Sequence, residues 1–185
     1  MPNDLNSIVL RLLHDPCAFA QTTSGITLRQ YQVKVAEAIY QSVLNAYGDS
    51  IVVMFPRQSG KNELQAQVEA FLITILSQYN AEMIKVSPTF KPQTLNAMRR
   101  LERTLEKNLI IKDLWKKESG YIYRFGTARM FFLSGGPEAN IVGATASHLL
   151  EVDEAQDIQI AKFDKDIAPM AASRNATREY WVPYR

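Results

Sequence analysis

The sequence predicts a single α/β domain with a mostly parallel sheet flanked by helices, and three strand-like runs support this fold class. The first run, residues 51–55, is followed by a glycine-bearing turn and by a helix whose apolar stripe covers residues 64–76. The other two runs are residues 82–87 and 147–152. Strands that alternate with helices are typical of a parallel sheet. The length of 185 residues fits one domain.

The segment before the first strand is expected to be helical. Apolar residues recur at helical spacing over residues 5–13, and the Asp-Pro pair at residues 15–16 ends this helix. Residues 21–25 are expected to form a loop. We therefore divide the chain into an N-terminal helical segment, residues 1–26, and a main domain, residues 27–185.

The next helix is expected to begin at Thr27. Thr27 and Gln30 have the spacing of a capping box, in which a hydroxyl and a side-chain amide satisfy each other's backbone N–H groups. An apolar face over residues 31–43 follows, and a turn at residues 47–50 leads into the first strand.

Residues 55–62, between the first strand and its helix, have the layout of a phosphate-binding loop. A helix start offers unpaired N–H groups and the positive end of the helix dipole. Gly60 allows a close backbone approach, and Lys61 can reach the outer phosphates. Phe55 stands where the usual pattern has glycine, and Asn62 stands where it has Ser or Thr. A plain turn with a solvated lysine remains the alternative at this point.

A strand that ends in two acids is the second strong feature. Asp153 and Glu154 follow the apolar run 147–152, which places them at the carboxyl edge of the sheet, where ligands of such sheets gather. Asp153 can hold Mg²⁺ through water, and Glu154 can activate an attacking water. Glu151 interrupts the run, and we expect strand alternation to turn it out of the main core. An exposed acidic strand end is the alternative interpretation.

The middle of the chain is expected to hold a helix and a β-hairpin. Residues 94–108 have a polar helical pattern, and residues 121–125 and 129–133 flank a short turn. Within residues 91–118 we count eight Lys or Arg against four Asp or Glu. Such an excess suits either a surface for DNA or a solvated helix face, and both interpretations stay open.

The composition sets milder bounds. A net charge of +2 is too small to argue for nucleic-acid binding by itself. The single cysteine excludes an internal disulfide and fits a reducing compartment. The apolar run at residues 71–76 is far shorter than the roughly 20 residues that a membrane span needs. We therefore expect a cytoplasmic setting and no membrane partner.

The order of these motifs resembles the N-terminal ATPase domain of viral terminase large subunits, the DNA-packaging motors of tailed bacteriophages. The segments that carry the resemblance are residues 28–32 (L-R-Q-Y-Q), 56–62 (P-R-Q-S-G-K-N), 86–90 (V-S-P-T-F), the hairpin, 143–148 (G-A-T-A-S-H) and 151–157 (E-V-D-E-A-Q-D). A loop without the first glycine is this family's own variant. The resemblance implies a P-loop NTPase fold of the RecA/ASCE-like type.

The same resemblance implies ATP and Mg²⁺ as cofactors and gives roles to individual residues. Glu154, Lys61 and Arg57 would be catalytic, with Arg57 contacting the γ-phosphate as a cis arginine finger or, alternatively, bridging the loop to neighbouring strands. Gln32 would read adenine, unless it is a solvated helix residue. The nucleotide-binding residues would be Gln32, Arg57, Gln58, Ser59, Gly60, Lys61 and Asn62, and Asn62 and Asp153 would hold the metal. An amide oxygen at Asn62 can bind Mg²⁺ but does not copy the geometry of a hydroxyl.

The function implied by the resemblance is ATP hydrolysis that drives double-stranded DNA into a procapsid. The implied partners are DNA, the portal protein, the small terminase subunit and further copies of the chain in a ring, in the host cytoplasm and transiently at the portal. A helicase-like phage ATPase of replication or repair, or a catalytically weak nucleotide-binding module, are the alternatives. The family's coupling motif and nuclease domain would lie beyond Arg185, so we expect a fragment or reduced relative with weak hydrolysis on its own.

Overall fold

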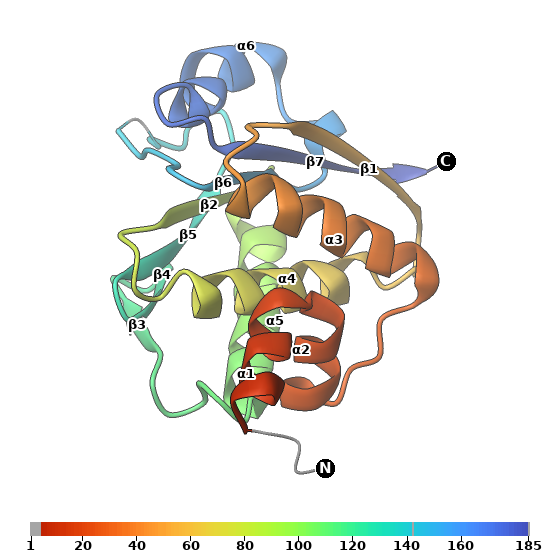
Figure 1. The fold of residues 1–185 in the computed structure, drawn as a ribbon. Helices are drawn as coiled ribbons and strands as arrows, with labels where there is room; N and C mark the ends of the chain where they lie inside the picture. Colours follow the sequence, from red (N-terminus) through yellow and green to blue (C-terminus); the bar gives the residue numbers. More distant parts are fainter. Residues whose placement is uncertain (1–4, 142, 185) are drawn as a thin grey trace.

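The computed structural model describes residues 5–141 and 143–184, which form one twisted sheet with helices on both faces (Figure 1). The strands are β1 (Ser50–Pro56), β2 (Glu82–Ser87), β3 (Lys116–Glu118), β4 (Ile122–Phe125), β5 (Ala128–Ser134), β6 (Leu149–Val152) and β7 (Thr177–Tyr184). The longer helices are α1 (Leu5–His14), α2 (Pro16–Ser24), α3 (Gln30–Leu44), α4 (Lys61–Ile75) and α5 (Leu95–Lys107). Short helical turns are η1 (Phe90–Thr94), η2 (Ala155–Asp157), α6 (Ile160–Lys162), η3 (Phe163–Ile167) and η4 (Ala168–Ala171).

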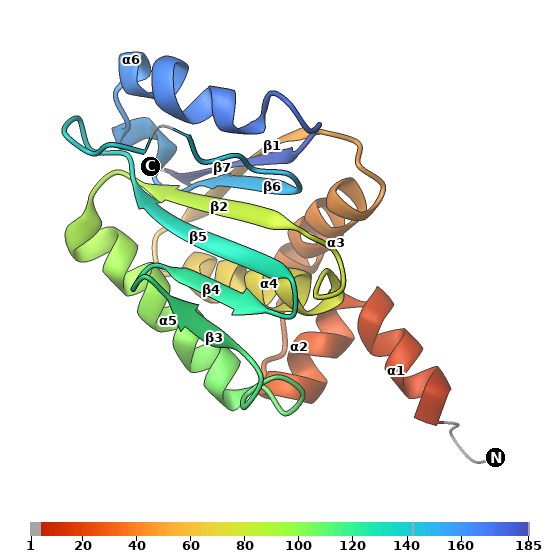
Figure 2. The same ribbon diagram turned by 90° about the vertical axis from the view of Figure 1, so that its left-hand side faces the viewer.

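The seven-stranded sheet has the order β1-β7-β6-β2-β5-β4-β3. The strands from β1 to β5 in this order run parallel, whereas β4 and β3 are antiparallel to their neighbours (Figure 2). The predicted α/β class, with a mostly parallel sheet and a hairpin formed by β4 and β5, is therefore confirmed. Because β7 lies between β1 and β6, the strand before the phosphate-type loop and the strand before the two acids are next-but-one neighbours.

Each face of the sheet has its own core. The larger core fills the space between the sheet and helices α2 to α5, and the fully buried Phe71, Leu101 and Trp181 belong to it. The second core lies under the short helical turns after β6, where Ile167 and Met170 pack on Ile84 and Leu150. A sheet that is covered on both faces buries both sides of its central strands, so the charged Lys85, Glu151 and Glu179 of these strands are buried as well.

The prediction of a loop at residues 21–25 is wrong for most of these residues, because α2 continues to Ser24. Asp15 ends α1 and also caps α2, since its carboxylate accepts hydrogen bonds from the backbone N–H groups of Cys17 and Ala18, both at 2.9 Å. Proline at the first helical position needs no N–H partner there. Phe19 of α2 stacks edge-on against Phe71 of α4, so this segment joins the main core. The domain boundary at residue 27 stays a prediction.

The start of α3 also differs from the expectation. The helix begins at Gln30, with Arg29 as its extended N-terminal neighbour, so Thr27 is not the cap. The side chain of Gln32 accepts the hydrogen bond from the Arg29 N–H at 2.9 Å. The amide that closes this helix end is thus Gln32 rather than Gln30, which shifts the helix start by a few residues. Among residues 5–141 and 143–184, every helix is too short or too polar to cross a membrane.

Candidate functional site

The turn between β1 and α4 requires a glycine at its last position. Gly60 has a left-handed backbone with φ of 81° and is the N-cap of α4. A Cβ at this position would lie 2.8 Å from Nε2 of Gln32. The backbone conformation therefore favours glycine, and a larger residue would also have to displace the Gln32 amide. Gln58 also has a positive φ, 61°, so the loop holds a tight shape that leaves the first N–H groups of α4 open.

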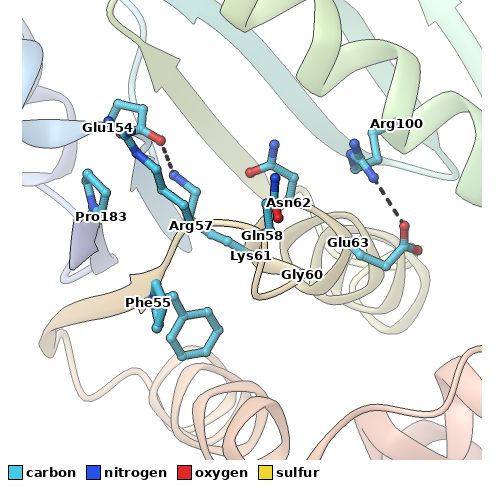
Figure 3. A pocket seen from close by; sticks show the side chains of 11 residues that line it. Phe55, Arg57, Gln58, Gly60, Lys61, Asn62, Glu63, Arg100, Glu154 and Pro183 are labelled. Carbon is cyan, nitrogen blue, oxygen red and sulfur yellow. Dashed lines mark hydrogen bonds and ion pairs between the residues drawn. The ribbon is translucent and has the colours of Figure 1, made fainter. Parts of the chain in front are cut away.

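Lys61 meets both predicted acids. Its Nζ lies 2.9 Å from Oδ1 of Asp153 and also forms an ion pair with Oε1 of Glu154. Figure 3 shows Glu154 directed toward the lysine from the far side of the loop. The loop after β1 and the acids after β6 thus converge at the carboxyl edge of the sheet, where α/β proteins bind their ligands.

The surroundings of Asp153 keep it ionised. Burial alone would raise its pKa, but the charges of Lys85 and Lys61 outweigh burial and hold the pKa of Asp153 below its ordinary value. Gln65 of α4 donates a further hydrogen bond to Oδ1 at 3.3 Å. An ionised and nearly buried carboxylate with fixed neighbours is suited to hold a cation or a lysine.

Glu154 has a strained backbone. Its φ of 46° lies in the left-handed region, which is costly for a residue other than glycine. One carboxylate oxygen pairs with Lys61, and the other accepts a hydrogen bond from Nε2 of Gln156 at 2.8 Å. The sharp turn after β6 therefore aims this carboxylate back over the loop rather than into solvent.

A pocket of about 400 Å³ opens above the loop. Of the residues predicted from the sequence, it is lined by Arg57, Gln58, Gly60, Lys61, Asn62 and Glu154 (Figure 3). An adjoining hollow of about 210 Å³ is lined by Asn62, Asp153 and Glu154 among others. The predicted lysine, acids and loop residues therefore surround two adjoining hollows that share Asn62 and Glu154 in their lining, with room for phosphate groups.

Arg57 projects into this pocket from an exposed position. Within the described part of the chain, its side chain makes no hydrogen bond or ion pair. The guanidinium is therefore available for a ligand, and its role as a cis arginine finger stays a prediction.

Gln32 lies behind the loop instead of in the pocket. It is only 5% exposed, and its Nε2 donates to the carbonyl oxygen of Gly60 at 3.2 Å. The hydroxyl of the adjacent Tyr31 donates to the carbonyl oxygen of Ser59 at 2.7 Å. These side chains brace the loop from α3, a role that the sequence analysis missed. Adenine recognition by Gln32 stays a prediction.

The expectation that Glu151 turns out of the main core is wrong, because its side chain is buried. Lys85 of β2 reaches Oε1 of Glu151 at 2.9 Å and Oε1 of Glu69, on α4, at 2.7 Å. All three side chains are at most 3% exposed. Burial alone would lower the pKa of Lys85, but Glu151 and Glu69 raise it above its ordinary value. This buried network joins the helix of the phosphate-type loop to the acid-bearing strand.

Glu179 of β7 adds another buried carboxylate to this region. It is 1% exposed, and its Oε2 accepts a hydrogen bond from Nε1 of Trp181 at 2.9 Å. Burial raises the pKa of Glu179 to about 8, although the bond from Trp181 acts in the opposite direction. The folded protein therefore holds a proton on Glu179 at neutral pH.

Replacing Glu179 by glutamine is expected to make stability less dependent on pH. The folded state keeps the proton between the ordinary pKa of 4.5 and about 8, whereas the unfolded state loses it, so the free energy of unfolding of the wild type falls as pH rises through this window. Glutamine cannot ionise and still accepts from Trp181. Urea unfolding at pH 5 and pH 8 should show that the free energy of unfolding of the variant, relative to the wild type, is higher at pH 8 than at pH 5. The exposed Glu106→Gln is the control, and parallel profiles for Glu179→Gln and wild type would contradict the assignment.

The residues fit Mg²⁺ only together with a ligand that brings oxygens of its own. Over the described ranges, no group of three or more His, Cys, Asp or Glu side chains could hold a metal ion alone. Mg²⁺ is commonly held by one or two carboxylates, water and the phosphates of a substrate. Asp153 supplies an ionised carboxylate, and Asn62 lines the same hollow with its amide.

The fold and the convergence of the loop with the two acids define a P-loop α/β fold of the RecA/ASCE-like class. No family model matches the chain, and no curated protein matches it in sequence. Among solved structures, it is similar to the large terminase of bacteriophage HK97, with a TM-score of 0.74 and 14% identity over 92% of this chain. The large terminase of a thermophilic bacteriophage gives TM-scores of 0.65 and, in a crystal form with ADP, 0.61, at 14% and 13% identity over 85% and 84% of this chain.

The chain spans 37% to 39% of the length of these terminases. At such low identity the likeness establishes the fold. The resemblance to the ATPase domain of terminase large subunits is thus confirmed in three dimensions, whereas activity and partners are matters for proposal.

Proposed function

We propose that this chain binds ATP with Mg²⁺ at the loop of residues 56–62 and hydrolyses it as the ATPase part of a viral DNA-packaging terminase. The observation that carries the proposal is the meeting of Lys61 with Asp153 and Glu154 beside an open pocket. One of the similar large terminases is described in complex with ADP, which supports an adenine nucleotide as the ligand.

Each group has a task that its chemistry suits. The N–H groups at the start of α4 and the Lys61 ammonium bind the β- and γ-phosphates. Asp153 and Asn62 would hold Mg²⁺, which neutralises phosphate charge when it is bound. Glu154 orients and deprotonates the attacking water, and Arg57 stabilises the charge that develops on the γ-phosphate.

The paired state of Lys61 adds a step to binding. Its ammonium is held by two carboxylates, so a phosphate has to compete with them for the lysine. Asp153 would hold a metal ion there, whose charge would take the place of the lysine charge. We therefore expect nucleotide binding to depend strongly on Mg²⁺.

In the wider setting, hydrolysis drives double-stranded DNA into a procapsid, with the portal protein and the small terminase subunit as partners and a ring of copies as the working assembly. The host cytoplasm, and transiently the procapsid portal, is the proposed location. The terminase fold supports this setting over a helicase-like role in replication or repair.

Glu154→Gln provides the direct test of the proposed activity. The variant should bind ATP with Mg²⁺ about as well as the wild type, because glutamine removes only the base and not the pocket. Hydrolysis should fall at least about 100-fold, since a general base contributes roughly 10²- to 10⁴-fold. Calorimetric binding and phosphate release measure the two properties separately. Glu138→Gln, an exposed glutamate away from the pocket, is the control. A wild type that binds no ATP, or a Glu154→Gln variant with undiminished hydrolysis, would refute the proposal.

A catalytically weak nucleotide-binding module is the second candidate, and Asn62 is the observation that favours it. Asn62 follows Lys61 at the position where a hydroxyl usually meets the metal. Its amide lines the hollow that also contains Asp153, but an amide oxygen lies farther from the backbone than the hydroxyl of Ser or Thr does. Binding without turnover in the experiment above would select this candidate.

A further inference from the structure

Arg100 of α5 enters the phosphate pocket from outside the loop. It lines the 400 Å³ pocket together with Lys61 and Glu154, and it also lines the adjoining hollow that contains Asp153. Figure 3 shows it across from Arg57, with Asn62 between them. The pocket is therefore bordered by a cation on a second structural element.

The packing of α5 fixes this placement. Met98, Leu101 and Leu105 are at most 3% exposed and hold one face of the helix against the core. Arg100 falls at the border of that face, beside α4, whereas Arg99 and Arg103 are exposed. The helix cannot rotate Arg100 away from the pocket without exposing its apolar residues.

The present partner of Arg100 holds it weakly. Its Nη1 lies 3.4 Å from Oε2 of Glu63, in the first turn of α4, and the two side chains are 35% and 36% exposed. Exposed ion pairs of this kind contribute little stability. The other oxygen of Glu63 accepts from Nε2 of Gln67 at 3.0 Å, so Glu63 has an alternative partner. A phosphate offers arginine a stronger, bidentate contact.

We propose that Arg100 exchanges Glu63 for the terminal phosphate of a bound nucleoside triphosphate and so acts as a second arginine of the pocket, contributed by α5. This inference rests on the proposed function, because it needs a triphosphate in the pocket. It makes Glu63 a competitor that holds Arg100 while the terminal phosphate is absent. ATP, unlike ADP, would then tie α5 to the phosphate-binding loop.

Two variants with opposite expected effects test the exchange. Arg100→Ala should weaken binding of a non-hydrolysable ATP analogue with Mg²⁺ by about tenfold and leave ADP binding nearly unchanged. Glu63→Gln should strengthen binding of the analogue a few-fold, because it frees Arg100. If Arg100 only braced Glu63, the two variants would change binding in the same direction. Arg129→Ala, which removes an exposed arginine near the start of β5, is the control.

Calorimetry with ADP and with the analogue gives the decisive ratios, and circular dichroism checks that each variant is folded. Equal losses for both nucleotides in Arg100→Ala, no loss at all, or weaker analogue binding by Glu63→Gln would overturn the assignment of Arg100 and leave the proposed function intact. A wild-type chain that binds neither nucleotide would overturn both.

Discussion

Replacing Lys61 by alanine is expected to lower the affinity for ATP with Mg²⁺ by about 100-fold and to abolish measurable hydrolysis. Hydrogen bonds to charged groups are worth about 1.5–3 kcal/mol each, and the Lys61 ammonium is placed to make more than one to the outer phosphates. The same change leaves Asp153 and Glu154 side by side without the cation that now lies between them. Calorimetric titration with ATP and Mg²⁺ measures the effect.

The control for Lys61→Ala is Lys107→Ala, an exposed lysine at the end of α5 that does not line the 400 Å³ pocket. It removes the same charge and should keep the wild-type affinity. Titrations with and without Mg²⁺ show how much of the lost ATP affinity depends on the release of Lys61 from the acids. With Mg²⁺ omitted, the wild type should bind ATP weakly because its lysine stays on the acids, so the gap between wild type and variant should narrow. Unchanged binding by Lys61→Ala would remove the pocket from the nucleotide site.

The sequence was informative where local pattern and chemistry coincide. Lys61 must follow the strand and Gly60 must precede the helix for the loop to work, and both can be recognised from their neighbours in the chain. Asp153 and Glu154 end an apolar run, and parallel strands bring their carboxyl ends to one edge of the sheet. The convergence of these residues therefore followed from the fold class alone.

Residues that act through packing could not be predicted in the same way. Glu151 is buried beside Lys85 of a neighbouring strand, and strand alternation carries no information about that partner. Arg100 faces the pocket because the apolar residues of α5 set the rotation of the helix. Gln32 was assigned to adenine from its motif, but its contacts with the loop depend on how α3 lies against β1. Each of these relations joins segments that are distant in sequence.

The acid-bearing strand and the loop helix are linked twice. At the surface of the pocket, Lys61 bridges α4 to Asp153 and Glu154. Beneath it, Lys85 bridges Glu69 of α4 to Glu151 of β6. A bound nucleotide would break the upper link, whereas the lower link lies deeper, with side chains at most 3% exposed at the floor of the adjoining hollow. The lower link can therefore keep the loop and the acids in register while Lys61 changes partners.

Replacing Lys85 by methionine is expected to lower the free energy of unfolding by about 3–5 kcal/mol at pH 7, because it leaves buried carboxylates without their cation. Lys85, Glu69 and Glu151 are at most 3% exposed, so the carboxylates have little contact with water. The control is Lys117→Met. Lys117 pairs with Glu102 at the same 2.7 Å as Lys85 with Glu69, but it is 37% exposed, and its loss should cost no more than about 1 kcal/mol.

Urea unfolding of the Lys85→Met and Lys117→Met variants measures this difference. Adding Glu69→Met and Glu151→Met to Lys85→Met should recover much of the lost stability, because an apolar cluster of similar volume replaces the unpaired charges. This triple variant also keeps the comparison informative if Lys85→Met alone does not fold. If Lys85→Met unfolds at the same urea concentration as Lys117→Met, the buried network contributes nothing to stability, and the lower link between loop helix and acid strand is not needed. If the triple variant is no more stable than Lys85→Met, the lost stability comes from packing and not from unpaired charge.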